Sequence, residues 1–297
     1  MTVDGEMLGE NDRLTSGTRL RLMSPLGHYW RSSLTTETAL YSASPEIIFT
    51  ACHFDEALHH GEYYSEFDDP CLEEVRLLAA LALPVGWDGG AVCLYPSEYE
   101  IVIPECPDLE SPTVAARLRS HLMDSLPTTE ERAQVQSGHL VGNYDFRDAA
   151  APLAVQKRLF DAIPIHDHLL LRGLSAWVKA VMLRVHRQFA LEALYSMFVS
   201  LDASMSLIFR DLERQGVRNP TALDAGAFLD QMQELEPQGV PYFADFYLDR
   251  IQLLHPNSRF GTMPYPPSSM GDFYHLEKAL REVYRMLIIG DLHLPTS

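Results

Sequence analysis

Residues 194–212 read LYSMFVSLDASMSLIFRDL, and the spacing of their apolar side chains decides the fold class of the second half of the chain. These side chains recur at steps of three or four, at Leu194, Met197, Leu201, Met205 (or Ser204), Ile208 and Leu212. One face of an α-helix has this period, so the stretch predicts a long helix with one buried side. Gly216 can end it, because glycine adopts the left-handed conformation of a helix C-terminus without steric cost.

The rest of the second half carries similar helical patterns. Asp167 can cap a helix with apolar positions at Leu170, Leu174, Trp177, Val181 and Val185. Further helices are expected from Asn219-Pro220 to about Leu235, from Pro241 to Leu254, and after the capping-box sequence Ser269-x-x-Asp272. The last of them places Phe273, Leu276, Leu280, Val283 and Leu287 on one seam, with Gly290 after its end. Residues 166–297 therefore predict an all-α helical bundle.

The first half predicts a mixed α/β region, so the chain as a whole is expected to be α+β. Strand-like runs of β-branched and aromatic residues cover 18–30, 38–54 and 90–103. Helical patterns cover Cys71–Leu83 and Pro112–Met123, the second behind Ser111 as a cap. Residues 125–144 are polar and rich in turn formers, which indicates a linker or a surface excursion. The expected domains are residues 1–150, an acidic mixed region with a sensing or interaction role, and residues 166–297.

The charge of the chain is strongly acidic and unevenly distributed. Of its 297 residues, 46% are hydrophobic and 22% charged, as in a folded protein with a sizeable core. The formal net charge of −18 argues against nonspecific nucleic-acid binding by the whole surface. Residues 1–165 hold 11 basic and 26 acidic side chains, whereas residues 166–297 hold 12 and 15. A polyanionic partner is therefore expected on the second half.

Cysteine usage and hydropathy predict a soluble, cytoplasmic protein. The four cysteines have no C-x-x-C spacing, so we expect reduced, buried thiols rather than a disulfide scaffold or a zinc site. The N-terminal residues lack the basic and apolar regions of a signal peptide. The longest uncharged apolar stretch, Leu77–Val85, is shorter than the ~20 residues that a bilayer requires, so no membrane contact is expected.

One stretch of the predicted bundle combines a fixed cation with a titratable group, namely YLDRIQLLHPNSR at residues 247–259. On a straight helix Arg250 and His255 would lie about 140° apart, so they share a face only if the helix ends between them. Pro256 disfavours the α conformation at His255, which predicts such an end. The helix dipole would favour the charged form of a histidine placed there.

This stretch resembles the R-x4-6-H signature of the HEPN superfamily, whose members are helical-bundle proteins and often ribonucleases. The same spacing occurs at Arg21/His28 and Arg132/His139, but only Arg250/His255 lies late in a predicted all-helical segment. The resemblance covers about residues 166–290. It implies a metal-independent endoribonuclease without a cofactor. His255 would move protons between the 2′-hydroxyl and the leaving oxygen, and Arg250 would stabilise the phosphate.

The resemblance also implies a homodimer in which the Arg250/His255 pairs of two protomers face one cleft. A toxin or defence effector would fit, with the first half as its sensing region. Ile251 departs from the family pattern, which usually has a polar residue directly after the arginine. The alternative is a noncatalytic HEPN-like module that dimerises while residues 1–165 recruit a protein partner. In that case Arg250 forms an ion pair with an acidic side chain, and His255 only marks the C-terminal end of a helix.

Two further residues are candidates for supporting this site. Asp202 lies on the predicted apolar face of its helix, so its carboxylate needs a partner, either Arg250 or another group of the bundle. Arg259 belongs to the loop Pro256–Ser268, which is long for a connection within a bundle. This loop is a lid, a dimer contact or a simple connection.

A basic run in the second half is the candidate contact for RNA phosphates. Residues 168–191 contain no acid and carry Arg172, Lys179, Arg184 and Arg187. These side chains either bind RNA or form a solvated helix face. The histidine-rich segments Cys52–His60 and His166–His168 have no recognised zinc spacing, so no metal is expected there. The sequence contains no Gly-rich phosphate loop, no G-x-S-x-G and no Rossmann fingerprint.

Overall fold

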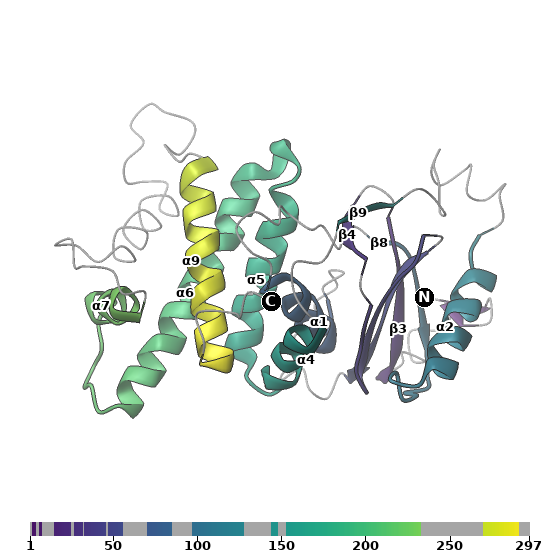
Figure 1. Ribbon diagram of the computed structural model, residues 1–297, viewed down its shortest axis with the longest axis horizontal. Coiled ribbons are helices and arrows are strands. Elements are labelled where there is room, and N and C mark those ends of the chain that lie inside the picture. Colours follow the sequence, from purple (N-terminus) through teal and green to yellow (C-terminus); the bar gives the residue numbers. More distant parts are fainter. Residues whose placement is uncertain are drawn as a thin grey trace. The chain divides into compact units, whose positions relative to one another are not determined.

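The computed structural model has an α+β fold, with an antiparallel sheet in the N-terminal region and helices through the C-terminal half (Figure 1). The chain divides into two compact units, Met1–His166 and Asp167–Ser297, which we call the sheet unit and the helical unit. The structure describes residues 2–3, 6–7, 15–24, 27–31, 33–45, 47–55, 70–84, 97–127, 144–147, 153–232 and 270–290.

The sheet unit is built on five antiparallel strands in the order β5-β6-β7-β3-β8. Their bounds are β3 Ser16–Met23, β5 Leu34–Thr35, β6 Ala39–Ala43, β7 Ile48–Asp55 and β8 Ser97–Ile103. Two short pairs accompany them, β1 (Thr2–Val3) with β2 (Glu6–Met7), and β4 (His28–Trp30) with β9 (Asp145–Arg147). In β3, Leu20 lies opposite Ala51 of β7 and Ile101 of β8.

Helices cover both faces of this sheet, and its long strands are accordingly buried on both sides. Helix α2 (Pro112–Asp124) packs on the face that carries Leu20, Leu22 and Phe49, and closes one core with its Leu118 and Leu122. Helix α1 (Leu72–Ala82) packs on the opposite face against β6 and β7, and α4 (Leu153–Ala162) packs on α1 (Figure 1).

A buried ion pair joins the sheet to α1. Arg21 of β3 is 1% exposed, and its Nε lies 3.2 Å from a carboxylate oxygen of Glu74 on α1 and 3.2 Å from one of Glu100 on β8. A buried charge is costly unless an opposite charge compensates it, so these contacts make the arginine tolerable in the core. Arg21 therefore has structural partners in Glu74 and Glu100.

The described elements confirm the helices expected in the first half and correct two of the strands. Helices α1 and α2 coincide with the predicted stretches, although the side chain of Ser111 makes no capping hydrogen bond. The predicted strand 18–30 is wrong as a single element, because β3 and β4 belong to different sheets on either side of a turn closed by Gly27 N–H and the Ser24 carbonyl. The predicted strand 38–54 is a hairpin, β6–β7. Helix α4 was not expected.

The helical unit is arranged around α6 (Ala190–Arg214), which contacts each of the other elements that the structure describes there (Figure 1). The others are α5 (His168–Leu183), the short 3-10 helix η3 (Arg187–Phe189), α7 (Ala222–Met232) and α9 (Met270–Ile289). The seam residues expected on α5, α6 and α9 are buried, apart from Val185 and Leu287, which are half-buried. The hydrophobic period therefore identified the packed faces of these helices.

The ends of the described helices follow the predicted signals, with one correction. Asp167 caps α5 by accepting the amide N–H of Leu170 at 3.2 Å, and Gly216 and Gly290 have φ of 94° and 67° after α6 and α9. The cap of α7 was placed wrongly at Asn219, because Thr221 and Asp224 form a reciprocal capping box instead. The expected helix Pro241–Leu254 and the cap Ser269 lie outside the described residues.

Helices α5, α6 and α9 meet closely at Gly173. Ser200 Oγ of α6 donates to the Gly173 carbonyl at 2.9 Å and lies 2.8 Å from the hydroxyl of Tyr284 on α9. A Cβ at position 173 would be 2.3 Å from that hydroxyl and 2.9 Å from the Cβ of Ala203. Such distances are shorter than van der Waals contact, so a glycine is required for this approach of three helices.

Among the described helices, α6 is long and apolar enough to cross a membrane by length and composition alone. Its most apolar window has a mean hydropathy of 1.3. Of this window, 61% is buried inside the protein, which is the behaviour of a core helix. The hydropathy of α6 is thus explained by its central place in the helical unit.

Candidate functional site

Three of the predicted site residues, Arg250, His255 and Arg259, lie outside the described residues, in the chain between α7 and α9. Their convergence therefore stays a prediction. Asp202 is described: it is half-buried on α6, and Phe198 and Met205 beside it are 2% exposed each. The structure bears out its place on a largely apolar face, whereas its pairing with Arg250 stays a prediction.

The basic run does not form one continuous surface. Arg172 is exposed in the first half of α5, and Lys179 is half-buried. Arg184 directly follows α5, and its side chain is only 7% exposed. Arg187 begins η3, and its side chain lies outside the described part. Contact of these residues with RNA stays a prediction, but Arg184 does not present its guanidinium to solvent.

Arg184 is held between a carboxylate and two aromatic rings of α9. Its Nη1 lies 3.7 Å from Oε2 of Glu277, whose side chain is also 7% exposed. Its Cζ lies 4.9 Å from the ring centroid of Tyr274 and 5.8 Å from that of Phe273. A cation over an aromatic face is attracted by the negative potential of the ring. Arg184 therefore links the end of α5 to the beginning of α9.

Glu277 binds a second guanidinium, that of Arg281, one helical turn further along α9. Arg281 lies 5.7 Å from the ring of Trp177, and the indole N–H of Trp177 donates to the Glu277 carbonyl at 3.4 Å. Burial lowers the pKa of the Arg281 guanidinium; the charge of Arg184 adds to this shift and that of Glu277 opposes it. Glu277 thus stabilises two arginines inside the helical unit.

Two exposed aromatic rings lie at this end of the helical unit. Tyr274 and Phe189 are each 43% exposed. Phe189 packs edge-on against His186, with 6.2 Å between the ring centroids, just after the turn that contains Arg184. The end of α5 meets the first turns of α9 where Arg184 contacts Tyr274, and η3 begins three residues after Arg184. We call Arg184, His186, Phe189 and Tyr274 the aromatic end of the helical unit.

Sequence reasoning missed this cluster, although its spacing was present. Trp177 and Arg184 are seven residues apart, which places them on the same side of an α-helix. Glu277 and Arg281 are four apart, a spacing that allows an ion pair along the helix. The seam of α5 was assigned to apolar residues only, so an arginine next to it was read as exposed.

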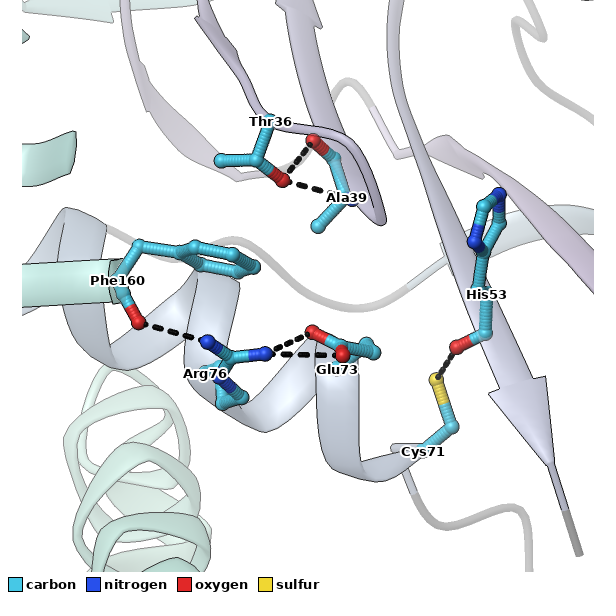
Figure 2. A network of polar contacts seen from close by, with 7 residues as sticks. All are labelled: Thr36, Ala39, His53, Cys71, Glu73, Arg76 and Phe160. Atoms are coloured by element: carbon cyan, nitrogen blue, oxygen red, sulfur yellow. Dashed lines mark hydrogen bonds and ion pairs between the residues drawn. The ribbon is translucent and has the colours of Figure 1, made fainter. Parts of the chain in front are cut away.

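A polar network in the sheet unit joins β7, α1 and α4 (Figure 2). Arg76 donates from Nη1 to both carboxylate oxygens of Glu73, at 2.9 and 2.8 Å, and from Nη2 to the Phe160 carbonyl at 3.0 Å. Its Cζ also lies 4.2 Å from the ring centroid of Phe160. The contacts with Phe160 fasten α4 to α1, and those with Glu73 hold the guanidinium in place for them, so we assign the network a structural role.

The same network contains a cysteine and a histidine that do not form a catalytic pair. Cys71 Sγ donates to the backbone carbonyl of His53 at 3.6 Å, and Figure 2 shows the imidazole pointing away from the thiol. His53 Nε2 lies 2.9 Å from the Pro107 carbonyl. Burial lowers the pKa of His53, although the Pro107 carbonyl acts in the opposite direction. The imidazole is therefore neutral at pH 7 and donates from Nε2.

Two of the three described cysteines behave as expected and one does not, while Cys93 lies outside the described residues. Cys52 and Cys71 are buried free thiols, whereas Cys106 is exposed. Burial, together with the neighbouring Cys71, raises the pKa of the Cys52 thiol, so Cys52 stays protonated and unreactive. Within the described residues, no three His, Cys, Asp or Glu side chains are placed to hold a metal ion.

No protein family, no curated protein and no solved structure shows detectable similarity to this chain. The resemblance to the HEPN superfamily therefore depends on the Arg250/His255 spacing and on its helical context. The helical context includes α5, α6 and α9, and the spacing occurs in the stretch that leads to α9.

Proposed function

We propose that this chain is a metal-independent endoribonuclease of the HEPN type, with its active residues in the helical unit. The observation that carries the proposal is the position of the Arg250/His255 pair. It lies in the stretch that leads to α9, the last described helix of a unit built around α5, α6 and α9. The helical unit is also the less acidic half of the chain, which favours it as the half that meets a polyanion.

The proposed reaction is attack of the RNA 2′-hydroxyl on the adjacent phosphorus. His255 takes the hydroxyl proton and a protonated histidine returns one to the 5′-oxygen as the P–O bond breaks, giving a 2′,3′-cyclic phosphate and a 5′-hydroxyl. Arg250 stabilises the negative charge that develops on the phosphate oxygens. We propose a cytoplasmic homodimer, in which two Arg250/His255 pairs face one cleft, and a role as a toxin or defence effector sensing through the sheet unit.

A noncatalytic, dimerising binding module is the second candidate. One observation favours it: Arg184, part of the basic run, is turned inward to Glu277, which leaves less positive charge for phosphate contacts. An exposed aliphatic side chain of α6, Val199, would then contribute to an interface. The sheet unit would recruit a protein partner through its acidic surface.

Cleavage of a mixed RNA pool, with a metal chelator present, separates the two candidates. Wild type should produce fragments ending in a 2′,3′-cyclic phosphate, and His255→Ala should produce none while remaining a dimer by light scattering. Arg250→Ala should lose about 10²–10³ in rate, as removal of an oxyanion donor does in other enzymes. Equal cleavage by wild type and His255→Ala would refute the catalytic pair. Absence of cleavage by an intact dimer would favour the binding module.

A further inference from the structure

We propose that the aromatic end of the helical unit binds single-stranded RNA by stacking unpaired bases on Tyr274 and Phe189. The inference rests on the proposed RNA substrate and extends it, by naming a surface that would hold the strand. It does not depend on cleavage at Arg250 and His255, because base stacking requires neither residue.

The first observation is exposure. Tyr274 and Phe189 are 43% exposed, and no other phenylalanine, tyrosine or tryptophan is exposed among the described residues. Aromatic rings are usually buried, because each ring removes a large apolar area from water. Here two exposed rings occur at the same end of one unit, where α5 ends and α9 begins. Because both exposed rings lie at this end, we infer that a bound ligand covers them.

The second observation is that a largely buried cation contacts the ring of Tyr274 from within the helical unit. The guanidinium of Arg184 lies 4.9 Å from its ring centroid and is itself held by Glu277 at 3.7 Å. The cation contact orders the ring before any ligand arrives, so stacking of a base costs less side-chain entropy. Phe189 is likewise contacted edge-on by His186.

The third observation concerns charge and composition. The chain from residue 168 to residue 191, which includes Phe189, contains no acid, and each ring has an exposed polar neighbour in sequence, Gln188 before Phe189 and His275 after Tyr274. A protein partner that binds by apolar contact would favour a continuous apolar patch. Rings with polar neighbours, one of them on a segment without acids, suit a single nucleic-acid strand, whose bases stack and whose phosphates are anionic. The ligand class favoured here is therefore single-stranded RNA.

The test measures binding by the full chain without allowing cleavage. The probe is a fluorescein-labelled, 2′-O-methylated single strand of about 15 nucleotides, which lacks the attacking hydroxyl and is long enough for one stacking surface. Fluorescence anisotropy at fixed salt gives the affinity. Tyr274→Ala should weaken binding by about 5- to 100-fold, the loss typical of one stacked base, and Phe189→Ala should act in the same direction.

Two further variants make the result specific. Tyr274→Trp keeps an aromatic ring, so it should retain affinity, and its indole fluorescence should be quenched when the strand binds. Leu223→Ala removes an apolar side chain that is 60% exposed on α7, away from the aromatic end, and should bind as wild type does. Thermal unfolding of each variant confirms that it is folded.

Several outcomes would overturn the inference. Unchanged affinity in both Tyr274→Ala and Phe189→Ala would do so, as would an equal loss in Leu223→Ala. If polyglutamate displaces the strand and Tyr274→Ala abolishes polyglutamate binding equally, the surface takes an acidic protein segment instead. Binding that depends on Tyr274 in a chain that cleaves no RNA would uphold the inference and refute the endoribonuclease. Cleavage that depends on His255, with wild-type affinity in Tyr274→Ala, would uphold the endoribonuclease and refute the stacking surface.

Discussion

The hydroxyl of Tyr284 on α9 donates to the backbone carbonyl of Ser200 on α6, at 2.9 Å, in the most closely packed part of the helical unit. Both side chains are fully buried, and burial raises the pKa of the tyrosine, so the hydroxyl stays protonated. The contact places the hydroxyl directly above Gly173 of α5, where no Cβ could fit. One phenol thus sets how closely three helices approach.

Gly173→Ala should destabilise the chain by about 1–3 kcal/mol through overpacking, and Tyr284→Phe by about 1–2 kcal/mol through loss of its hydrogen bonds. In the double variant the closest clash, 2.3 Å from the hydroxyl oxygen, is removed. The two losses should therefore sum to more than the loss in the double variant, as a urea-unfolding double-mutant cycle would measure. Strict additivity would mean that the hydroxyl does not limit the approach.

Asp167→Ala should lower the free energy of unfolding by about 1–2 kcal/mol, because the helix cap and the contact with Arg210 are both lost. Arg210 donates to Asp167 Oδ2 at 2.6 Å and to Oδ1 at 3.2 Å. Asp167→Asn is the matched control, since asparagine keeps the cap and loses the charge, and its loss should be smaller.

This effect should depend on pH. Burial alone would raise the pKa of Asp167, but the hydrogen bonds from Arg210 and from the Leu170 amide outweigh burial and lower it. The charged form therefore adds stability above the unfolded pKa, near 3.8, and this stability is lost as the pH falls through the lower folded pKa. The difference in thermal stability between wild type and Asp167→Asn should narrow below about pH 4. A difference that stays constant down to pH 3 would contradict the assignment.

Arg184→Ala and Arg172→Ala should have different effects, although both residues belong to the basic run. Arg184 is buried against Glu277, so its removal should lower the unfolding temperature. Arg172 is exposed, so Arg172→Ala should leave stability within about 0.5 kcal/mol of wild type. If Arg172 contacts phosphate, the same variant should flatten the salt dependence of RNA binding by about 0.7 in the logarithmic slope. An unchanged slope would assign Arg172 to a solvated face.

Arg21→Ala should destabilise the sheet unit by about 3–5 kcal/mol, because it leaves the buried carboxylate of Glu74 without its principal cation. Arg117→Ala, on the exposed side of α2, is the control and should change stability by less than about 0.5 kcal/mol. Urea unfolding of both variants, followed by circular dichroism, makes the comparison. Similar stability of the two variants would show that other groups compensate the buried negative charge of Glu74.

The helices were predictable where one face of the sequence is apolar over several turns. Leu201 and Ile208 lie on such a face and are completely buried. Helix ends were predictable where a residue has a specific local function, as at Asp167 and Gly290. Helix α4 was missed because it spans Leu153–Ala162 only and carries an exposed leucine, Leu153, and a buried glutamine, Gln156. A short helix of this composition shows no clear period.

The sheet order and the Arg184 cluster could not be predicted, because both depend on contacts between distant residues. Nothing in the sequence of β3 indicates that β7 and β8 flank it, since strand pairing is selected by the packing of both faces. Likewise, Arg184 could face solvent or core until α9 brings Glu277 and Tyr274 against it. The spacing of Arg250 and His255 predicts a site, but its geometry depends equally on tertiary contacts.

The pairing of β3 with β8 has a consequence for how the chain folds. Joining Leu20 to Ile101 closes a loop of about 80 residues, and the entropy of that closure must be overcome before β3 has both of its neighbouring strands. In the helical unit, α5 and α6 are joined by the short segment 184–189 and can associate as soon as both exist. The helical hairpin should therefore assemble faster than the sheet, although the sheet unit leaves the ribosome first. During synthesis, a slowly closing sheet precedes a rapidly folding pair of helices on the same nascent chain.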